Sequence, residues 1–392
     1  MKPSNTDRAA KVLDRAGLDE LFGVLKSRGY TLTGPVVRDG AVVYEEVAST
    51  EELPVGVGDG HEPGKYRLDR RKDDALFGYV VGPQSWKKHL FPPEQRLFQV
   101  SRNGKSIETS AEEADGRPRA LIGVRACELA AMAVQDKVFL GGSFVDPHYG
   151  ARREKLFIVA VNCGEPASTC FCASIGTGPE ARDGFDIGLT ELIQNGRHEF
   201  FAQAGSERGD GVLGEVGGRV AMADDERRRA KVVAGAVERM RRSMETEGLK
   251  ELLYRNYESP HWDRVAERCL SCANCTMVCP TCFCSTVEDV TDLSGAHAER
   301  WRRWDSCFTM DFSYIVGGSV RPSTSARYRQ WMTHKLATWQ DQFGQIGCVG
   351  CGRCITWCPV GIDITEEAAA LKEFEQTSKR TKQEKHDGRQ EL

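Results

Sequence analysis

Two cysteine loops near the C-terminus constrain this chain more than any other part of its sequence. Each has the spacing C-x2-C-x2-C-x3-C-P, in which three thiolates hold one 4Fe–4S cubane and the fourth holds the other cubane. Thiolate sulfur is soft and suits iron–sulfur clusters. The proline ends each turn with its fixed φ. The spacing therefore predicts two crossed ligand sets: Cys269, Cys272, Cys275 and Cys358 for the first cluster, and Cys279, Cys348, Cys351 and Cys354 for the second.

Structural zinc is the alternative for these loops. Zinc sites usually take four ligands from paired C-x2-C units. Paired C-x2-C units do not account for two complete copies of C-x2-C-x2-C-x3-C-P in one chain. The spacing therefore favours iron–sulfur clusters, and with them electron transfer.

Length and composition indicate a protein of several domains without a membrane span. The 392 residues, 40% of them hydrophobic, allow two or three domains with cores of their own. The net charge of -4 implies no general attraction to nucleic acid. Residues 1–20 are polar, and no apolar run is long enough to cross a bilayer. Fifteen cysteines held as reduced thiols or metal ligands predict a cytoplasmic location.

The pattern of apolar residues predicts a mixed α/β domain over residues 1–247. Residues 18–26 have the spacing of one helical face, closed by Gly29, and two β-rich runs flank the hairpin signal Asp39-Gly40. Further predicted strands at 119–124, 156–161, 187–192 and 199–204, with helices at 129–139 and 223–244, complete the α/β pattern. The predicted loop 51–64 has no G-x-G-x-x-G, and no P-loop occurs in the chain, so we expect no nucleotide site.

A largely helical, ferredoxin-like domain with two clusters is predicted for residues 248–376. Helices at 249–257 and 261–268 lead into the first loop, and a helix at 364–374 follows the second. Residues 280–347 exceed what a minimal two-cluster ferredoxin needs, so we interpret them as an insertion that includes a helix at 325–343. The polar residues 377–392 are predicted to be a disordered tail.

The cysteines outside the two loops predict a third site. Cys163-x6-Cys170-x-Cys172 is denser than chance burial explains, and Cys127 stands at the start of a predicted helix, where free N–H groups favour a thiolate. Our hypothesis is a third iron–sulfur cluster or metal site that uses some of these four. The alternative is that they are small buried residues. The roles of the remaining cysteines stay open: Cys282, Cys284 and Cys307.

Groups near the loops are expected to tune the cluster potentials. The Ser271 and Thr276 hydroxyls and the Gly350 and Gly352 N–H groups are predicted to donate to sulfur. Arg353, inside the second loop, is predicted to raise the potential of that cluster by favouring its reduced state. The alternative is an arginine that faces solvent.

These motifs together resemble a known family. Residues 269–290, with C-x2-C-x2-C-T-x-V-C-P-T-C-F-C, are similar to the iron–sulfur beta subunits of cytoplasmic sulfhydrogenases, which are NAD(P)-linked nickel–iron hydrogenases. They are equally similar to the A-type subunits of anaerobic sulfite reductases. Residues 304–308, 327–329, 334–335 and 347–354 strengthen the resemblance, and residues 123–128 resemble G-V-R-P-C-D except at Ala126 and Glu128. The resemblance spans residues 76–366.

The resemblance implies an electron-transfer subunit of a multisubunit oxidoreductase. In such complexes a separate flavin subunit exchanges hydride with NAD(P)H, and a catalytic subunit, here a nickel–iron hydrogenase rather than a sulfite reductase, performs the terminal chemistry. A self-sufficient iron–sulfur oxidoreductase in which Cys127 acts chemically is one alternative, which the missing nucleotide motifs disfavour. A stand-alone carrier is another, which the large N-terminal region disfavours. No Ser-His-Asp, H-E-x-x-H or paired-carboxylate arrangement stands out, so no catalytic residue is predicted.

Overall fold

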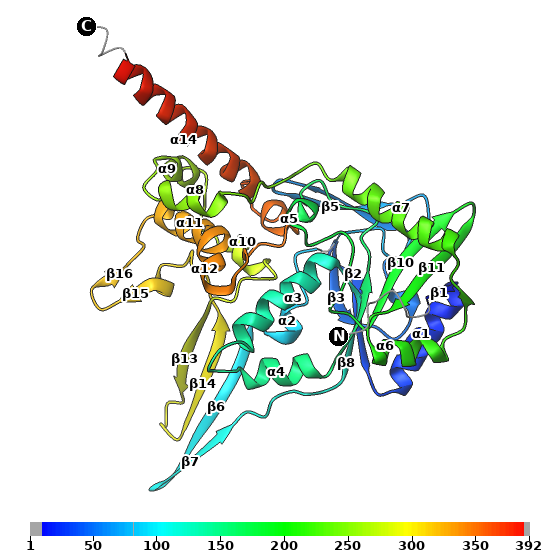
Figure 1. The fold of residues 1–392 in the computed structure, drawn as a ribbon. Helices are drawn as coiled ribbons and strands as arrows, with labels where there is room; N and C mark the ends of the chain where they lie inside the picture. The colour runs from blue at the N-terminus through cyan, green and yellow to red at the C-terminus, as the bar shows by residue number, and fades with distance from the viewer. Residues whose placement is uncertain (1–9, 81, 388–392) are drawn as a thin grey trace.

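An eight-stranded sheet forms the centre of the computed structural model, which describes residues 10–80 and 82–387 (Figure 1). Its middle strands β10, β9, β8 and β2 are parallel, and antiparallel strands extend it on both sides. In spatial order the strands are β12 (Arg219–Val220), β1 (Lys11–Leu13), β11 (Arg197–Ala204), β10 (Ile187–Gln194), β9 (Leu156–Val161), β8 (Arg119–Val124), β2 (Thr31–Arg38) and β3 (Ala41–Glu46). The predicted mixed α/β fold is confirmed.

Helix α1 (Arg15–Ser27) shows how the sequence places a helix on this sheet. The Asp14 side chain accepts a hydrogen bond from the Gly17 N–H at 2.9 Å and so caps the helix. Gly29, with φ at 84°, follows its end, as predicted. The predicted apolar face is buried against the sheet and consists of Leu18, Leu21, Phe22 and Leu25.

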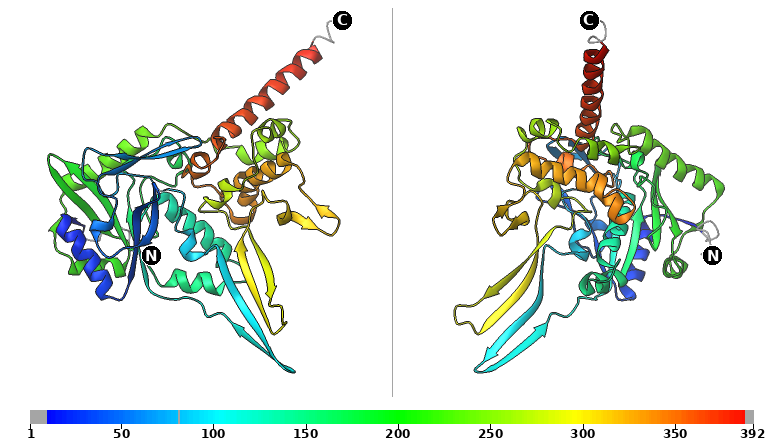
Figure 2. Two further views of the ribbon diagram at one scale, coloured as in Figure 1. Left: turned by 180° about the vertical axis from the view of Figure 1, so that it is seen from behind. Right: turned by 60° about the vertical axis from the view of Figure 1, so that its left-hand side comes forward.

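Helices cover both faces of the sheet (Figure 2). Helix α6 (Glu207–Glu215) shares one hydrophobic core with α1. Helices α3 (Ala126–Phe139) and α4 (Pro147–Glu154) pack on the other face, where α7 (Ala223–Arg239) covers β10 and β11. The helix predicted for residues 223–244 is thus present but ends at Arg239.

A second sheet joins the N-terminal and C-terminal parts of the chain. Its strands, in spatial order, are β13 (Ser285–Thr291), β14 (His297–Trp304), β6 (Glu94–Asn103) and β7 (Ser106–Ala111). The pairing of β14 with β6 connects a hairpin from residues 280–347 to a hairpin from residues 1–247. The division at residue 247 stays a prediction, and this sheet crosses it. Both hairpins project together from the body as one arm (Figures 1 and 2).

Helices surround the two cysteine loops. They are α8 (Leu249–Arg255), α9 (His261–Ala266), α10 (Asn274–Met277), α11 (Thr324–Thr333), the π-helix η4 (His334–Thr338), α12 (Trp339–Phe343), α13 (Arg353–Thr356) and α14 (Ile364–Asp387). The C-terminal part is not helical throughout, because residues 280–347 also form β13, β14 and the short hairpin β15 (Tyr314–Ile315) and β16 (Gly318–Ser319). Within the part of the chain that the structure describes, no helix has the length and apolar character needed to span a bilayer.

The predicted disordered tail is wrong over its first part. Helix α14 continues through residues 377–387, while residues 388–392 lie outside the described residues. Glu, Lys, Gln and Arg dominate this stretch, and these residues have favourable helix propensities. The helix begins at buried residues near Ile364, and it continues into the polar stretch because these polar residues favour helix.

The predicted loop at residues 51–64 is also wrong, because it contains ordered elements. The 3-10 helix η2 (Thr50–Glu52) is followed by the hairpin of β4 (Val57–Glu62) and β5 (Lys65–Arg70). The tip of this hairpin contacts the second cysteine loop, since the Gly64 N–H donates to the Ile355 carbonyl at 3.1 Å and His61 Nδ1 lies 3.2 Å from Thr356 Oγ1. The remaining short helices are α2 (Lys87–Leu90), α5 (Cys172–Ile175) and η3 (Asp311–Ser313).

Candidate metal centre

The two cysteine loops have the same backbone conformation and contact each other through their short helices α10 and α13. Each loop places left-handed residues at the same two positions: Ser271 and Ala273 in the first loop, and Gly350 and Gly352 in the second, with φ of 51°, 67°, 61° and 73°. Positive φ is uncommon for Ser and Ala and marks functional turns more often than ordinary ones. The repeat in the sequence is therefore a repeat in the structure.

The structure brings together the predicted ligands in the two crossed sets. Cys269, Cys272, Cys275 and Cys358 line one hollow, whose other walls include Phe308 and Tyr328. In the second set, burial raises the pKa of the Cys354 thiol, and the nearby charges of Cys348, Cys351 and Cys279 raise it further. The fourth cysteine of each loop thus lies with the first three of the other loop.

Backbone donors surround these sulfurs in the way that a cluster requires. The N–H groups of Ser271, Gly350 and Ile362 donate to Cys269, Cys348 and Cys358 at 3.4, 3.5 and 3.3 Å. Hydrogen bonds to sulfur stabilise the reduced cluster and tune its potential. The Gly350 prediction is confirmed. At Ser271 the donor to sulfur is the backbone N–H and not the predicted hydroxyl, which contacts Thr324 Oγ1 at 3.1 Å.

The predicted Thr276 contact is wrong, because that hydroxyl donates to the Ala273 carbonyl at 2.7 Å. The Gly352 N–H stays a prediction. Among the described residues, no three Cys, His, Asp or Glu side chains converge closely enough to hold one bare metal ion. Each set consists of four cysteine thiols, the donors that 4Fe–4S clusters use, so the residues present fit such clusters.

Comparisons with known proteins agree with this geometry. A family model described as a 4Fe-4S dicluster domain matches residues 268–362, which include all eight predicted ligands. Sulfhydrogenase 2 subunit beta of Pyrococcus furiosus is 33% identical over 367 residues, which are 90% of this chain and 96% of that relative. This chain belongs to the sulfhydrogenase beta-subunit family. No solved structure matches it. As a member of that family it is an iron–sulfur, electron-transfer subunit with two 4Fe–4S clusters.

Lys335 is the most prominent residue of this beta subunit that the sequence did not reveal. It is 5% exposed and lies on the π-helix η4, and Nζ contacts the sulfurs of Cys279 and Cys282 at 3.3 and 3.4 Å. Burial lowers the pKa of Lys335, but the negative charge of Cys279, Cys282 and Cys348 as thiolates outweighs burial and raises it, so the ammonium stays charged beside thiolates. A hydrogen bond from Cys282, with the charge of Lys335, lowers the pKa of Cys279 despite burial.

The three cysteines of unassigned role lie around the same lysine. Lys335 contacts Cys282 directly, and a hydrogen bond between Cys284 and Cys307 lowers the pKa of Cys284 to about 7. A second buried lysine, Lys87, donates to the Cys282 carbonyl at 3.1 Å. Two buried cations therefore face this group of sulfurs, and π-helices of this kind are frequent at functional sites.

Arg353 does not face solvent, so that alternative is wrong. The side chain is 1% exposed and forms an ion pair with Glu128 at 2.7 Å, and its Nε donates to the Gly82 carbonyl at 3.2 Å. Glu128, which is also 1% exposed, accepts a hydrogen bond from the Tyr44 hydroxyl at 3.0 Å. Because Glu128 offsets much of the positive charge, Arg353 ties the second loop to helix α3, and its predicted effect on the potential stays a prediction.

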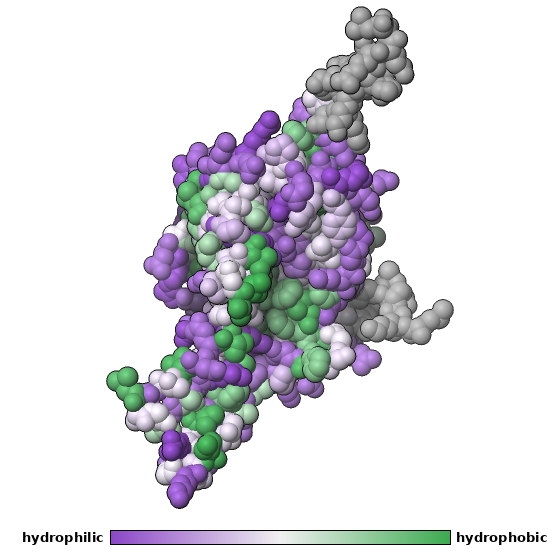
Figure 3. Space-filling view, turned by 90° about the vertical axis from the view of Figure 1, so that its left-hand side faces the viewer, coloured by the Kyte–Doolittle hydropathy of each residue, from purple (hydrophilic) through white to green (hydrophobic). Residues whose placement is uncertain are grey.

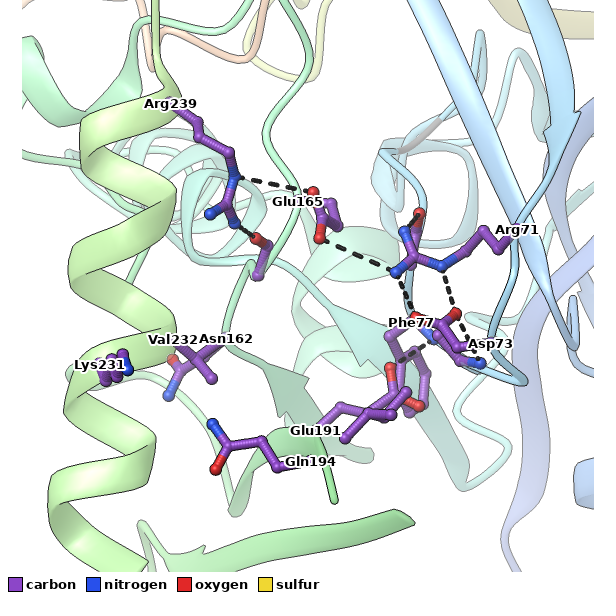
Figure 4. A pocket seen from close by; sticks show the side chains of 14 residues that line it. Arg71, Asp73, Phe77, Asn162, Glu165, Glu191, Gln194, Lys231, Val232 and Arg239 are labelled. Atoms are coloured by element: carbon purple, nitrogen blue, oxygen red, sulfur yellow. Dashed lines mark hydrogen bonds and ion pairs between the residues drawn. The ribbon is translucent and has the colours of Figure 1, made fainter. Parts of the chain in front are cut away.

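A hollow of about 290 Å³ opens between α7 and the sheet (Figure 4). Its lining includes Asn162 and Glu165, which flank Cys163 closely in sequence. Most of its charges are paired: Arg71 with Asp73 at 2.6 Å, and Arg239 with Glu165 at 3.7 Å. Cys163 itself does not line the hollow, which is adjacent to that cysteine only along the chain.

Replacing Lys335 tests its effect on the second cluster. Lys335→Met is expected to lower the reduction potential of that cluster by on the order of 100 mV, because a buried positive charge favours the more negative reduced state. Redox titration followed by electron paramagnetic resonance measures the shift. Lys105→Met, which removes an exposed lysine in the turn between β6 and β7, is the matched control. Equal potentials in both variants and the wild type would contradict the assignment.

Replacing Glu128 tests the link between the second loop and helix α3. Glu128→Gln is expected to destabilise the full chain by about 3–5 kcal/mol, because Arg353 then remains buried without a counter-charge. Calorimetric unfolding of the cluster-loaded chain measures this loss. The control Glu45→Gln removes an exposed pair with Arg38 and is expected to change little. A Glu128→Gln variant as stable as this control would refute the structural role.

Proposed function

We propose that this chain carries single electrons between a flavin subunit that reacts with NAD(P)H and a nickel–iron hydrogenase subunit. The observation that supports this role most directly is the pair of crossed cysteine sets, which places two cluster sites side by side in one fold. Bound 4Fe–4S clusters supply one-electron carriers, which a two-electron flavin needs as its outlet. The name of the Pyrococcus furiosus relative favours a hydrogenase complex over a sulfite reductase.

In this proposal, Cys269, Cys272, Cys275 and Cys358 hold the first cluster, and Cys279, Cys348, Cys351 and Cys354 hold the second. Apolar side chains pack around the loops and keep water away from the sulfurs. Those that are most deeply buried include Ile355, Met332 and Leu336. Low local polarity strengthens the effect of every nearby charge on the clusters, which gives Lys335 its influence on the second site.

The first cluster site is the one that meets the surface. Cys272 is exposed, Leu270 next to the first ligand is 63% exposed, and Val360 follows the second loop as another exposed apolar residue. The second loop, in contrast, is covered by the β4–β5 hairpin and by residues 169–172. We therefore assign electron exchange with a partner protein to the surface around Leu270 and Val360.

The projecting arm formed by β6, β7, β13 and β14 supplies a surface for the other subunits. In Figure 3 hydrophobic residues lie among polar ones on this projecting part of the molecule. The exposed apolar residues of the arm are Ile107, Val287, Val290 and Leu293. Exposed apolar groups on a projecting element mark protein interfaces more often than free surface. We infer that the arm binds another member of the same cytoplasmic complex.

Anaerobic purification of the tagged chain from its native host tests this function. We expect a nickel–iron subunit and a flavin subunit to co-purify, with NAD(P)-linked hydrogen turnover. Cys272→Ser is expected to keep both partners but to abolish nearly all of that turnover, because one ligand of the surface-facing cluster is lost. Hydrogen oxidation with a dye that takes electrons directly from the catalytic subunit is the control and is expected to persist.

Other outcomes of this purification contradict the proposal in distinct ways. A sirohaem subunit with sulfite reduction in place of hydrogen turnover would assign the chain to a sulfite reductase. Purification without any partner would refute the role as a subunit. Normal NAD(P)-linked turnover in Cys272→Ser would show that electrons do not pass through the first cluster.

A further inference from the structure

We propose that Cys127, Cys163, Cys170 and Cys172 hold a third 4Fe–4S cluster, located between the parallel sheet and the second cysteine loop. The 4Fe-4S dicluster match at residues 268–362 does not include any of these four residues. The proposal deepens the proposed relay, but it stands on the geometry of this part of the chain.

The segments that carry Cys127, Cys163 and Cys172 meet at one turn, Gly178–Pro179. A Cβ at Gly178 would lie 3.0 Å from the Cys172 sulfur and 3.4 Å from the Cβ of Ala126, the residue before Cys127. The Cys163 N–H donates to the Pro179 carbonyl at 3.1 Å. Cys170 and Cys172 are 6% exposed and lie where the chain enters α5, ahead of this turn. The end of β9, the start of α3 and the start of α5 thus bring thiols to one place.

Ordinary burial of small residues gives no reason for four cysteines from three separate segments of the chain to converge. Metal binding deprotonates thiols and can use all four of them as ligands.

The donor set of the third group consists of cysteine thiols, the ligands that 4Fe–4S clusters use. The two ferredoxin-type sites, which the family comparison identifies as 4Fe–4S sites, have the same donor set.

Two guanidinium groups, each with one nitrogen that lacks a partner, point to an anionic group at this position. Arg125 is 3% exposed, and its Nε has no hydrogen-bond partner; its Nη1 donates to the carbonyl of Asn162, next to Cys163, at 3.4 Å. Arg353 Nη1 is also buried without a partner, and its Nη2 pairs with Glu128, next to Cys127. Buried donors without partners are costly. A negatively charged cluster between these two arginines would accept both hydrogen bonds.

The proposed site adjoins the second cluster and not the first. The Phe171 N–H donates to the Gly350 carbonyl at 2.9 Å, the Thr177 hydroxyl donates to the Val349 carbonyl at 2.8 Å, and the Cys170 sulfur lies 3.8 Å from the Cys351 carbonyl. The second cluster site therefore lies between the first cluster site and the proposed third one. One electron that reaches the third cluster reduces it from 2+ to 1+ and leaves the second cluster oxidised from 1+ to 2+.

Counting iron and acid-labile sulfide in the anaerobically reconstituted full chain tests the proposal. We expect about twelve irons in the wild type and about eight in Cys163→Ala/Cys170→Ala, with the spectra of the first cluster unchanged. Val212→Ala, which shortens a buried side chain of α6 in the core shared with α1, is the control and is expected to keep about twelve. Mössbauer spectroscopy of the ⁵⁷Fe-labelled chain identifies all of the iron as 4Fe–4S.

A wild-type chain with about eight irons would overturn the proposal, as would a double variant that keeps about twelve. If the double variant loses all iron because it does not fold, the wild-type count alone decides. A count of about eight irons and one zinc per chain would show that the third group binds zinc, and would also overturn the proposal. Eight irons together with intact NAD(P)-linked hydrogen turnover would leave the proposed relay in place and remove only its third member.

Discussion

The buried ion pair between Glu128 and Arg353 connects the two halves of this protein. Glu128 belongs to helix α3 on the central sheet, and Arg353 lies within the second cysteine loop, so the pair fixes the loop against the N-terminal domain. Removing either partner would leave the other charge buried and unpaired. The free-energy cost of such a charge is far larger than the net stabilisation that the ion pair provides. The Tyr44 hydroxyl donates a further hydrogen bond to Glu128, and Arg353 Nε donates one to the Gly82 carbonyl. The orientation of the second cluster site therefore depends on the N-terminal domain.

A close backbone contact reinforces this link and explains two glycines. A Cβ at Gly350 would lie 2.6 Å from the backbone of Cys172, and one at Gly352 would lie 2.5 Å from the Thr169 carbonyl. Both glycines also have positive φ, which other residues adopt at a cost. In the first loop, Ser271 and Ala273 take the equivalent conformations. The close approach of residues 169–172 to Gly350 and Gly352 thus explains why the second loop has glycine at both positions.

The sequence predicted those parts of the structure that depend on residues close together along the chain. The cysteine spacing identified both loops, and periodic apolar residues located α1 and the central strands, because these features depend on neighbours along the chain. The pairing of β14 with β6, the position of Lys335 beside Cys279 and the burial of Arg353 depend on residues far apart in sequence. A lysine or arginine looks the same in sequence whether it faces water or a thiolate. The helix in residues 377–387 was missed for a different reason, since polar composition was weighed above helix propensity.

Buried positive charge is concentrated around the cysteines, and this distribution couples folding to cluster binding. Lys87, Lys335, Arg125 and Arg353 are all nearly inaccessible to solvent, and each contacts or adjoins a cysteine segment. Burial lowers the pKa of Lys87 to about 8, against the opposing charges of Cys282 and Cys279. Such cations are stable inside a protein only beside negative charge. Thiolates and clusters provide that charge, whereas neutral thiols do not. We therefore expect the bound clusters to supply negative charge that stabilises these buried lysines and arginines, so that cluster binding also stabilises the fold.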